Sequence, residues 1–136
     1  MGVFRNNASF GKRNEYAVIA ELMKRNFDVY QTLVDDQGID CVIRVDSTKY
    51  LDIQIKASSK TATQGRNFGG LNVDLRDNYY FIFYVEEQDE FYIIPSVDFK
   101  KLWRKTTKEG KHKGKYNVVI RKKGFEQYKD FEILRR

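Results

Sequence analysis

Four polar side chains have the types that hydrolysis of a phosphodiester requires. Asp40 begins one stretch of alternating residues, Gln54 and Lys56 lie two apart on the next stretch, and Glu15 lies upstream of both. Carboxylate and amide oxygens are hard ligands that hold Mg²⁺, which polarises a phosphoryl oxygen and activates a water molecule. A nearby lysine orients the nucleophile or stabilises the charge that develops in the transition state. This chemistry requires a fold that brings the four side chains together.

The local sequence predicts that Asp40 and Gln54 meet. Residues 39–45 and 50–56 each alternate between apolar and polar positions, which is typical of half-buried strands, and the turn residues between them predict a hairpin. Two strands joined by a short turn place Asp40 and Gln54 side by side. Gln54 and Lys56 then project to one side of the sheet, about 7 Å apart along the strand.

Glu15 is expected on a helix over residues 10–25, with Ser9 as its N-cap. The apolar stripe of this helix is predicted to consist of Tyr16, Ile19, Ala20, Met23 and Phe27. Glu15 stands one turn before Ile19, at the edge of the apolar face. From that position the carboxylate can approach Asp40 and Gln54.

The rest of the chain predicts an α/β fold in one domain, residues 1–136. The further expected elements are strands over 27–34, 79–85, 91–94 and 117–121, a short helix from a Ser96 cap to Trp103, and amphipathic turns with Phe125, Tyr128, Phe131 and Leu134. Residues 57–78 show no clear period. So long a stretch without regular structure is often functional.

The chain resembles the PD-(D/E)XK nuclease superfamily in three segments, Gly11 to Glu15, Gly38 to Asp40 and Gln54 to Lys56. Its Holliday-junction-resolvase-like, Mrr-like and homing endonuclease branches are the most similar. The resemblance covers residues 10–60, and more weakly 79–95. It implies a restriction-endonuclease-like αβββαβ core with C-terminal helix and strand additions, Mg²⁺ (or Mn²⁺ in its place), DNA as substrate, and a homodimer or higher homo-oligomer.

The resemblance also assigns roles to single residues. Glu15, Asp40 and Gln54 match its metal-site positions, Lys56 matches its catalytic lysine, and all four are expected to be catalytic. Two departures accompany the match. Gln54 replaces the commoner glutamate, which removes a charge from the metal site. Residues 57–78 do not read as the helix that usually follows the third strand.

A strongly basic segment favours a polyanionic partner, with nucleic acid first. Residues 100–123 contain eleven basic side chains and one acid, Glu109, whereas the remaining residues carry 14 basic and 18 acidic side chains. A solvated lysine-rich loop is the ordinary alternative. The 57–78 stretch is expected beside the site, in contact with the substrate backbone. The residues expected to bind nucleic acid are Lys60, Arg66, Arg76, Lys111, Lys113 and Lys115.

Composition excludes several classes of protein. The 136 residues, with a net charge of +6, fit one domain with a sizeable core, and collagen-like and disulfide-rich chains are excluded. The single cysteine, Cys41, cannot form an intrachain disulfide and is expected as a small core residue. No stretch has the length and apolarity of a membrane span, and the first twelve residues do not resemble a signal peptide. We therefore expect a cytoplasmic protein.

Each candidate residue also has an ordinary structural reading. Glu15 can be an exposed helix acid, Asp40 can close a turn, and Lys56 can protect a sheet edge. Asp52 shares a strand face with Gln54 and can support the site from behind. His112, within the basic segment, is expected to be exposed and has no predicted role.

Three functions therefore remain open. The first is a Mg²⁺-dependent DNA endonuclease. The second is a degenerate nuclease fold that binds DNA without cutting it, and the Gln54 substitution motivates this reading. The third is a protein-interaction domain with an incidental basic loop, which would bind DNA weakly and with little dependence on salt.

Overall fold

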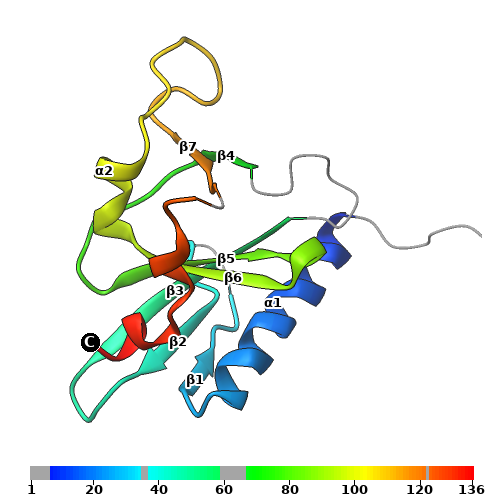
Figure 1. Cartoon of the computed structure of the whole chain (residues 1–136), viewed down its shortest axis with the longest axis vertical. Helices are drawn as coiled ribbons and strands as arrows, with labels where there is room; N and C mark the ends of the chain where they lie inside the picture. Colours follow the sequence, from blue (N-terminus) through cyan, green and yellow to red (C-terminus); the bar gives the residue numbers. More distant parts are fainter. Residues whose placement is uncertain (1–6, 35–36, 59–66, 122) are drawn as a thin grey trace, which may run out of the picture.

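A five-stranded mixed sheet forms the centre of the protein (Figure 1). The computed structural model describes residues 7–34, 37–58, 67–121 and 123–136. The sheet has the order β1-β2-β3-β5-β6, in which only β3 and β5 are parallel. Its strands are β1 (Asp28–Gln31), β2 (Cys41–Arg44), β3 (Tyr50–Ser58), β5 (Tyr79–Val85) and β6 (Glu90–Pro95). The predicted α/β class is confirmed.

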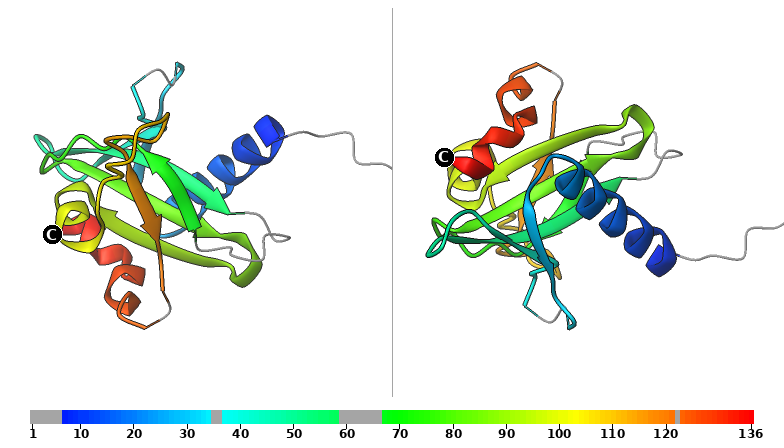
Figure 2. Two further views of the ribbon diagram at one scale, coloured as in Figure 1. Left: turned by 90° about the horizontal axis from the view of Figure 1, so that it is seen from above. Right: turned by 90° about the horizontal axis from the view of Figure 1, so that it is seen from below.

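A helix and a two-stranded ribbon cover opposite faces of this sheet (Figure 2). The helix is α1 (Asn7–Lys24), and the ribbon pairs β4 (Asn67–Leu71) with β7 (Tyr116–Val119). The ring of Phe68 on β4 lies 4.8 Å from that of Phe83 on β5, and Phe83 pairs with Lys56 on β3. Side chains of paired residues point to the same face, so Lys56 and Gln54 face the ribbon.

Short helical segments complete the fold. They are α2 (Phe99–Leu102) and four 3₁₀ turns, η1 (Glu86–Gln88), η2 (Ser96–Asp98), η3 (Glu126–Lys129) and η4 (Phe131–Arg135). The predicted C-terminal amphipathic turns are confirmed, because Phe125, Tyr128, Phe131 and Leu134 are all buried. Within the described residues, no helix is long and apolar enough to cross a bilayer.

The hairpin that carries Asp40 and Gln54 is confirmed. β2 and β3 pair antiparallel, and the turn is held by Asp46 Oδ1, which accepts from the backbone N–H groups of Thr48 and Lys49. β3 alternates between buried and half-buried residues from Leu51 to Lys56. Its polar residues can therefore face the ribbon while its apolar residues pack beneath the sheet.

The prediction for α1 was wrong in two details. Ser9 lies inside the helix, which already includes Asn7, and so is not its N-cap. The buried face is formed by Val18, Ile19 and Leu22, with Asn14, whereas the predicted stripe residues Tyr16 and Met23 are 53% and 60% exposed. Tyr16 and Met23 are spaced along the helix as the residues of a buried face would be, but the sheet contacts the adjacent face of the helix.

Two further predictions were wrong downstream. The stretch 57–78, expected to lack regular structure, contains β4, which pairs with the distant β7. Ser96 does not cap a helix with its side chain, because its hydroxyl donates to the carbonyl of Arg76 and accepts from the Arg76 N–H. The αβββαβ pattern leads one to expect a helix between β3 and β5, and the described residues there, 67–78, contain none.

Candidate active site

Asp40 lies at the start of β2 with its carboxylate against β3. The residue is 3% exposed, and the backbone N–H of Ile55 donates to its Oδ2 at 2.6 Å. The backbone N–H of Asp40 donates to the Ile53 carbonyl at 2.8 Å. The paired part of β2 ends at Cys41. The carboxylate thus accepts the hydrogen bond of the Ile55 N–H on β3, which lies just beyond the last residue that pairs with β2.

Gln54 lies beside Asp40, as predicted. Its Nε2 is 3.5 Å from Asp40 Oδ2, at the outer limit of a hydrogen bond, and its Oε1 is 3.1 Å from the hydroxyl of Tyr79. The same hydroxyl donates to the carbonyl of Gly38 at 2.7 Å. Gly38 has φ +71°, and a Cβ at this position would lie 2.6 Å from Gln54 Oε1. Glycine is therefore required for backbone conformation and for close approach.

Glu15 approaches the same region from α1. Its side chain is 13% exposed and forms an ion pair of 3.2 Å with Lys12. A hydrogen bond to Glu15 raises the pKa of Lys12, and the charge of Asp40 contributes in the same direction. Burial raises the pKa of Cys41 to about 12, and the charges of Asp40 and Glu15 act in the same direction. Both carboxylates therefore lie within electrostatic reach of the same two groups, Lys12 and Cys41.

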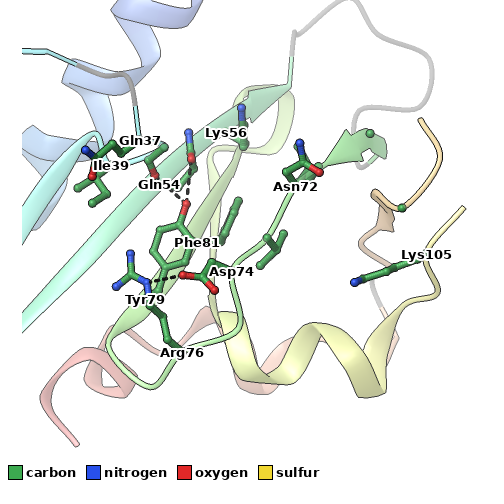
Figure 3. A pocket seen from close by; sticks show the side chains of 15 residues that line it. Gln37, Ile39, Gln54, Lys56, Asn72, Asp74, Arg76, Tyr79, Phe81 and Lys105 are labelled. Carbon is green, nitrogen blue, oxygen red and sulfur yellow. Dashed lines mark hydrogen bonds and ion pairs between the residues drawn. The ribbon is translucent and has the colours of Figure 1, made fainter. Parts of the chain in front are cut away.

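Gln54 and Lys56 line a cleft of about 860 Å³ between the sheet and the β4–β7 ribbon (Figure 3). Lys105 lines the opposite side, together with residues from the end of β4 and from the segment that follows it, 70–74 and Arg76. Asp40 does not line this cleft and meets it through Gln54. Besides the Gln54 amide and the two lysine amines, the cleft is lined by the polar side chains of Gln37, Asn72, Asp74 and Arg76. The buried Asp40 carboxylate lies behind the Gln54 amide.

Arg76, predicted to bind nucleic acid, lies on the wall of the cleft. Its guanidinium lies 2.7 Å from Asp52 and 3.1 Å from Asp74, and it stacks over the Tyr79 ring with 4.5 Å to the centroid. Asp52 is the residue expected to support the site from behind, and the structure places it on the same strand face as Gln54. The two carboxylates fix the Arg76 side chain. They would compete with a phosphate for its guanidinium.

Of the basic residues between α2 and β7, Lys105 lines the cleft, and Lys111, Lys113 and Lys115 lie on the loop that follows it. Lys111 and Lys113 are exposed and Lys115 is half-buried, and Lys113 forms an ion pair with Glu109. His112 is exposed, as expected, and its ring lies against Gly70 of β4, where a Cβ would be 2.3 Å from Nδ1. This contact joins the loop to the ribbon.

The remaining predicted residues are Lys60 and Arg66, which lie outside the described residues. Cys41 is a buried free cysteine in the core, as predicted. Trp103 packs against Phe99 and Phe125, and its indole N–H donates to the Val119 carbonyl. Trp103 is therefore a packing residue.

The donor set fits a Mg²⁺ ion that is bound by few protein ligands. In the described part of the chain, no group of three His, Cys, Asp or Glu side chains is close enough to hold a metal. Mg²⁺ usually takes one or two carboxylates and fills its other positions with water and substrate phosphate. Asp40 and the Gln54 amide supply hard oxygens of this kind when the amide turns its oxygen toward Asp40, and Glu15 on α1 is the further candidate ligand.

Sequence reasoning missed Tyr79 and Gly38 as parts of the site. Tyr79 was expected only as the first residue of a strand, and Gly38 only as the first residue of a segment that matches the resemblance. No local pattern indicates the parallel pairing between β3 and β5, which sets Asp52 opposite Tyr79 and so brings the hydroxyl to Gln54. That register joins two strands that are not neighbours in the chain.

Solved structures similar to this chain include two nucleases. A bacterial homing endonuclease, I-Ssp6803I, is 22% identical with a TM-score of 0.61, over 95% of this chain and 87% of that one. D212, a nuclease from a fusselovirus, is 23% identical with a TM-score of 0.50, over 80% of this chain and 81% of that one. The chain shares their fold. No protein-family model matches the sequence, and a search of curated proteins finds no relative of it.

Proposed function

We propose that this protein is a Mg²⁺-dependent DNA endonuclease that hydrolyses phosphodiester bonds. The observation that carries the proposal is that Gln54, beside the buried Asp40, and Lys56 line one cleft with Lys105 on its opposite side. The fold shared with two nucleases supports it. The same three positions support membership of the PD-(D/E)XK superfamily, as the resemblance of the sequence implies.

Each residue of the set has a distinct role in this proposal. Asp40, Glu15 and Gln54 would hold the ion, and Mn²⁺ would substitute for Mg²⁺. When bound, the metal supplies charge neutralisation at the scissile phosphate and a more acidic water. Lys56 projects into the cleft from the same strand face as Gln54, where its amine orients the nucleophile and stabilises the extra negative charge of the transition state.

The cationic side of the cleft would hold the DNA backbone. Lys105 lines the cleft directly, and Lys111, Lys113 and Lys115 follow it on the adjoining loop. Lysine ammonium groups bind phosphates as point charges and release counterions from the DNA. Lys60 and Arg66, which precede β4, are also proposed to bind the DNA backbone. Arg76 would join them once it is released from Asp52 and Asp74.

The proposal extends to assembly and location. A homodimer or a higher homo-oligomer would bring two sites to the two strands of a duplex, and light scattering with and without DNA measures this directly. A cytoplasmic location is part of the proposal.

A second candidate is a degenerate nuclease fold that binds DNA without cutting it. Two observations favour it. Gln54 brings no charge to the metal site, and its Nε2 rather than its Oε1 faces the Asp40 carboxylate. Glutamine at position 54 carries no negative charge, and its amide N–H faces Asp40. The two side chains can therefore lie side by side without a metal ion to neutralise them.

Cleavage of supercoiled plasmid and of branched DNA in Mg²⁺, Mn²⁺ and EDTA separates the two candidates. Wild type is compared with Asp40→Asn, Lys56→Ala and the control Lys24→Ala, which removes an exposed lysine from the end of α1. We expect metal-dependent cutting that falls at least about 100-fold in the first two variants and is unchanged in the control. Binding without cutting in every metal, by all four proteins, would favour the second candidate.

A further inference from the structure

The hydroxyl of Tyr79 lies between two oxygen atoms of the site. It is 2.7 Å from the Gly38 carbonyl oxygen and 3.1 Å from Gln54 Oε1, both of which accept hydrogen bonds (Figure 3). A tyrosine hydroxyl carries one hydrogen and can accept through its oxygen. The shorter contact, to Gly38, is the better use of that hydrogen. The Tyr79 hydroxyl oxygen and Gln54 Oε1 then face each other with no hydrogen between them.

Half a turn of the Gln54 amide removes this conflict. The turn exchanges Oε1 and Nε2, so that the amide N–H donates to the Tyr79 hydroxyl oxygen while the hydroxyl still donates to Gly38. The amide oxygen then faces Asp40 Oδ2 at a position now occupied by nitrogen, 3.5 Å away. Two oxygens so placed repel one another unless a cation lies between them.

We infer that Tyr79 is a positioning residue that sets the orientation of the Gln54 amide and so presents its oxygen, with Asp40, to a divalent cation. The inference rests on the proposed metal site and specifies how an uncharged residue serves as a ligand there. A glutamine can bind a cation only through its amide oxygen and not through its amide nitrogen, whereas both terminal atoms of a glutamate are oxygens. The hydroxyl of Tyr79 distinguishes those ends.

Tyr79 is held firmly enough for this role. The residue is 4% exposed, its ring packs 5.2 Å from that of Phe81, and the guanidinium of Arg76 stacks on its face. Arg76 is in turn fixed by Asp52 at 2.7 Å. The missing Cβ of Gly38 leaves the space in which the hydroxyl and the amide meet. Neighbours that orient a metal ligand typically change metal affinity about 10- to 100-fold when removed.

The test is Mn²⁺ binding by the whole, DNA-free protein, followed by the loss of the free-ion signal in electron paramagnetic resonance. Tyr79→Phe removes the hydroxyl and keeps the ring. Tyr84→Phe is the matched control, because it removes another tyrosine hydroxyl from β5, one that donates to Asp89 at 2.8 Å. We expect Tyr79→Phe to weaken Mn²⁺ binding about tenfold and Tyr84→Phe to leave it unchanged.

A double-mutant cycle distinguishes amide orientation from general damage to the fold. In a Gln54→Glu background both ends of the side chain are oxygens, so Tyr79→Phe should change Mn²⁺ affinity less than about twofold, against about tenfold in wild type. An equal effect in both backgrounds, or none in wild type, overturns the inference.

The same titration tests the proposed function separately. If wild type binds Mn²⁺, Asp40→Asn does not, and Tyr79→Phe binds as well as wild type, then the metal site stands and the role of Tyr79 fails. If wild type itself binds no Mn²⁺, the metal site fails and the role of Tyr79 fails with it.

Discussion

The Asp40 carboxylate accepts a hydrogen bond of 2.6 Å from the backbone N–H of Ile55, just beyond the last residue pair of β2 and β3. One side chain therefore has two tasks. It completes the hydrogen bonding of a strand that continues past its neighbour, and it places a negative charge next to Gln54. A buried N–H without an acceptor costs about 1–3 kcal/mol, so stability alone favours an acceptor at this position.

The two tasks of Asp40 can be separated by substitution. Asp40→Asn keeps an oxygen that can accept from Ile55, and we expect its free energy of unfolding to stay within about 1 kcal/mol of wild type. Asp40→Ala leaves the N–H unsatisfied and should lose about 1–3 kcal/mol. Both variants should lose metal-dependent cleavage, since the negative charge is gone. Urea unfolding and plasmid cleavage measure the two effects, and an active Asp40→Asn protein would contradict the proposed ligand.

Gly38→Ala tests the close packing of the site. The positive φ of Gly38, +71°, penalises alanine by about 1–2 kcal/mol, and the added Cβ would also press on Gln54 Oε1. Gly124→Ala is a matched control, because its φ is +93° and no atom lies within 4 Å of the added Cβ. Both variants should lose similar stability by urea unfolding.

Only Gly38→Ala should also weaken Mn²⁺ binding, by about tenfold, because only this Cβ displaces the Gln54 amide. Equal Mn²⁺ affinity in Gly38→Ala and Gly124→Ala would show that the amide adjusts without loss. Gly38 would then matter to the backbone alone.

The basic loop should contribute to DNA affinity through charge. Changing Lys111, Lys113 and Lys115 together to alanine should lower the slope of log affinity against log salt by about 0.9 for each phosphate that the protein no longer neutralises, or about 2–3 in all. The measurement is fluorescence anisotropy of a labelled duplex in EDTA at several salt concentrations. The control changes Lys24, Lys49 and Lys129 to alanine, which removes the same charge from positions outside the loop between α2 and β7. An equal fall in slope for both triple variants would mean that only net charge matters.

Glu109 allows a test of the opposite sign. Its carboxylate forms an ion pair with Lys113, so Glu109→Gln should free the ammonium for phosphate and raise DNA affinity severalfold at low salt. The gain should disappear when Lys113 is already alanine. A gain that persists there would come from reduced long-range repulsion between Glu109 and DNA.

The protein should lose stability in alkaline solution. Burial raises the pKa of Cys41 to about 12 and that of Tyr84 to about 12, whereas the unfolded chain releases these protons near about pH 8.5 and 10, respectively. A raised folded-state pKa stabilises the fold fully below the unfolded-state pKa, and this contribution is lost as pH rises toward the folded-state value. Burial also raises the pKa of Tyr128, in the same direction.

Urea midpoints should therefore fall steadily between about pH 8.5 and pH 11. Cys41→Ala lowers stability at every pH through lost packing, but it should flatten the part of the fall between about pH 8.5 and 10. A wild-type midpoint that stays constant over the whole range would contradict this expectation. Alkylation of Cys41 by iodoacetamide provides a second readout and should be slow until the protein unfolds.

Short-range patterns in the sequence predicted much of the site. The hairpin of β2 and β3 was predictable because alternation and a turn are local, and they set Asp40 beside Gln54. The buried face of α1 was not predictable to the same degree. Tyr16 and Met23 fit an apolar stripe as well as Val18 and Leu22 do, and only the position of the sheet decides between them.

The amino-acid sequence was enough to predict the hairpin, the pairing of Asp40 with Gln54, the shared face of Gln54 and Lys56, and the basic segment, because each depends on residues close in the chain. The folded chain was needed to reveal the pairing of β4 with β7, the cleft beneath that ribbon, and the contact of Tyr79 with Gln54 and Gly38. These features join segments far apart in the sequence. Their geometry follows from strand register and packing, which no local pattern encodes.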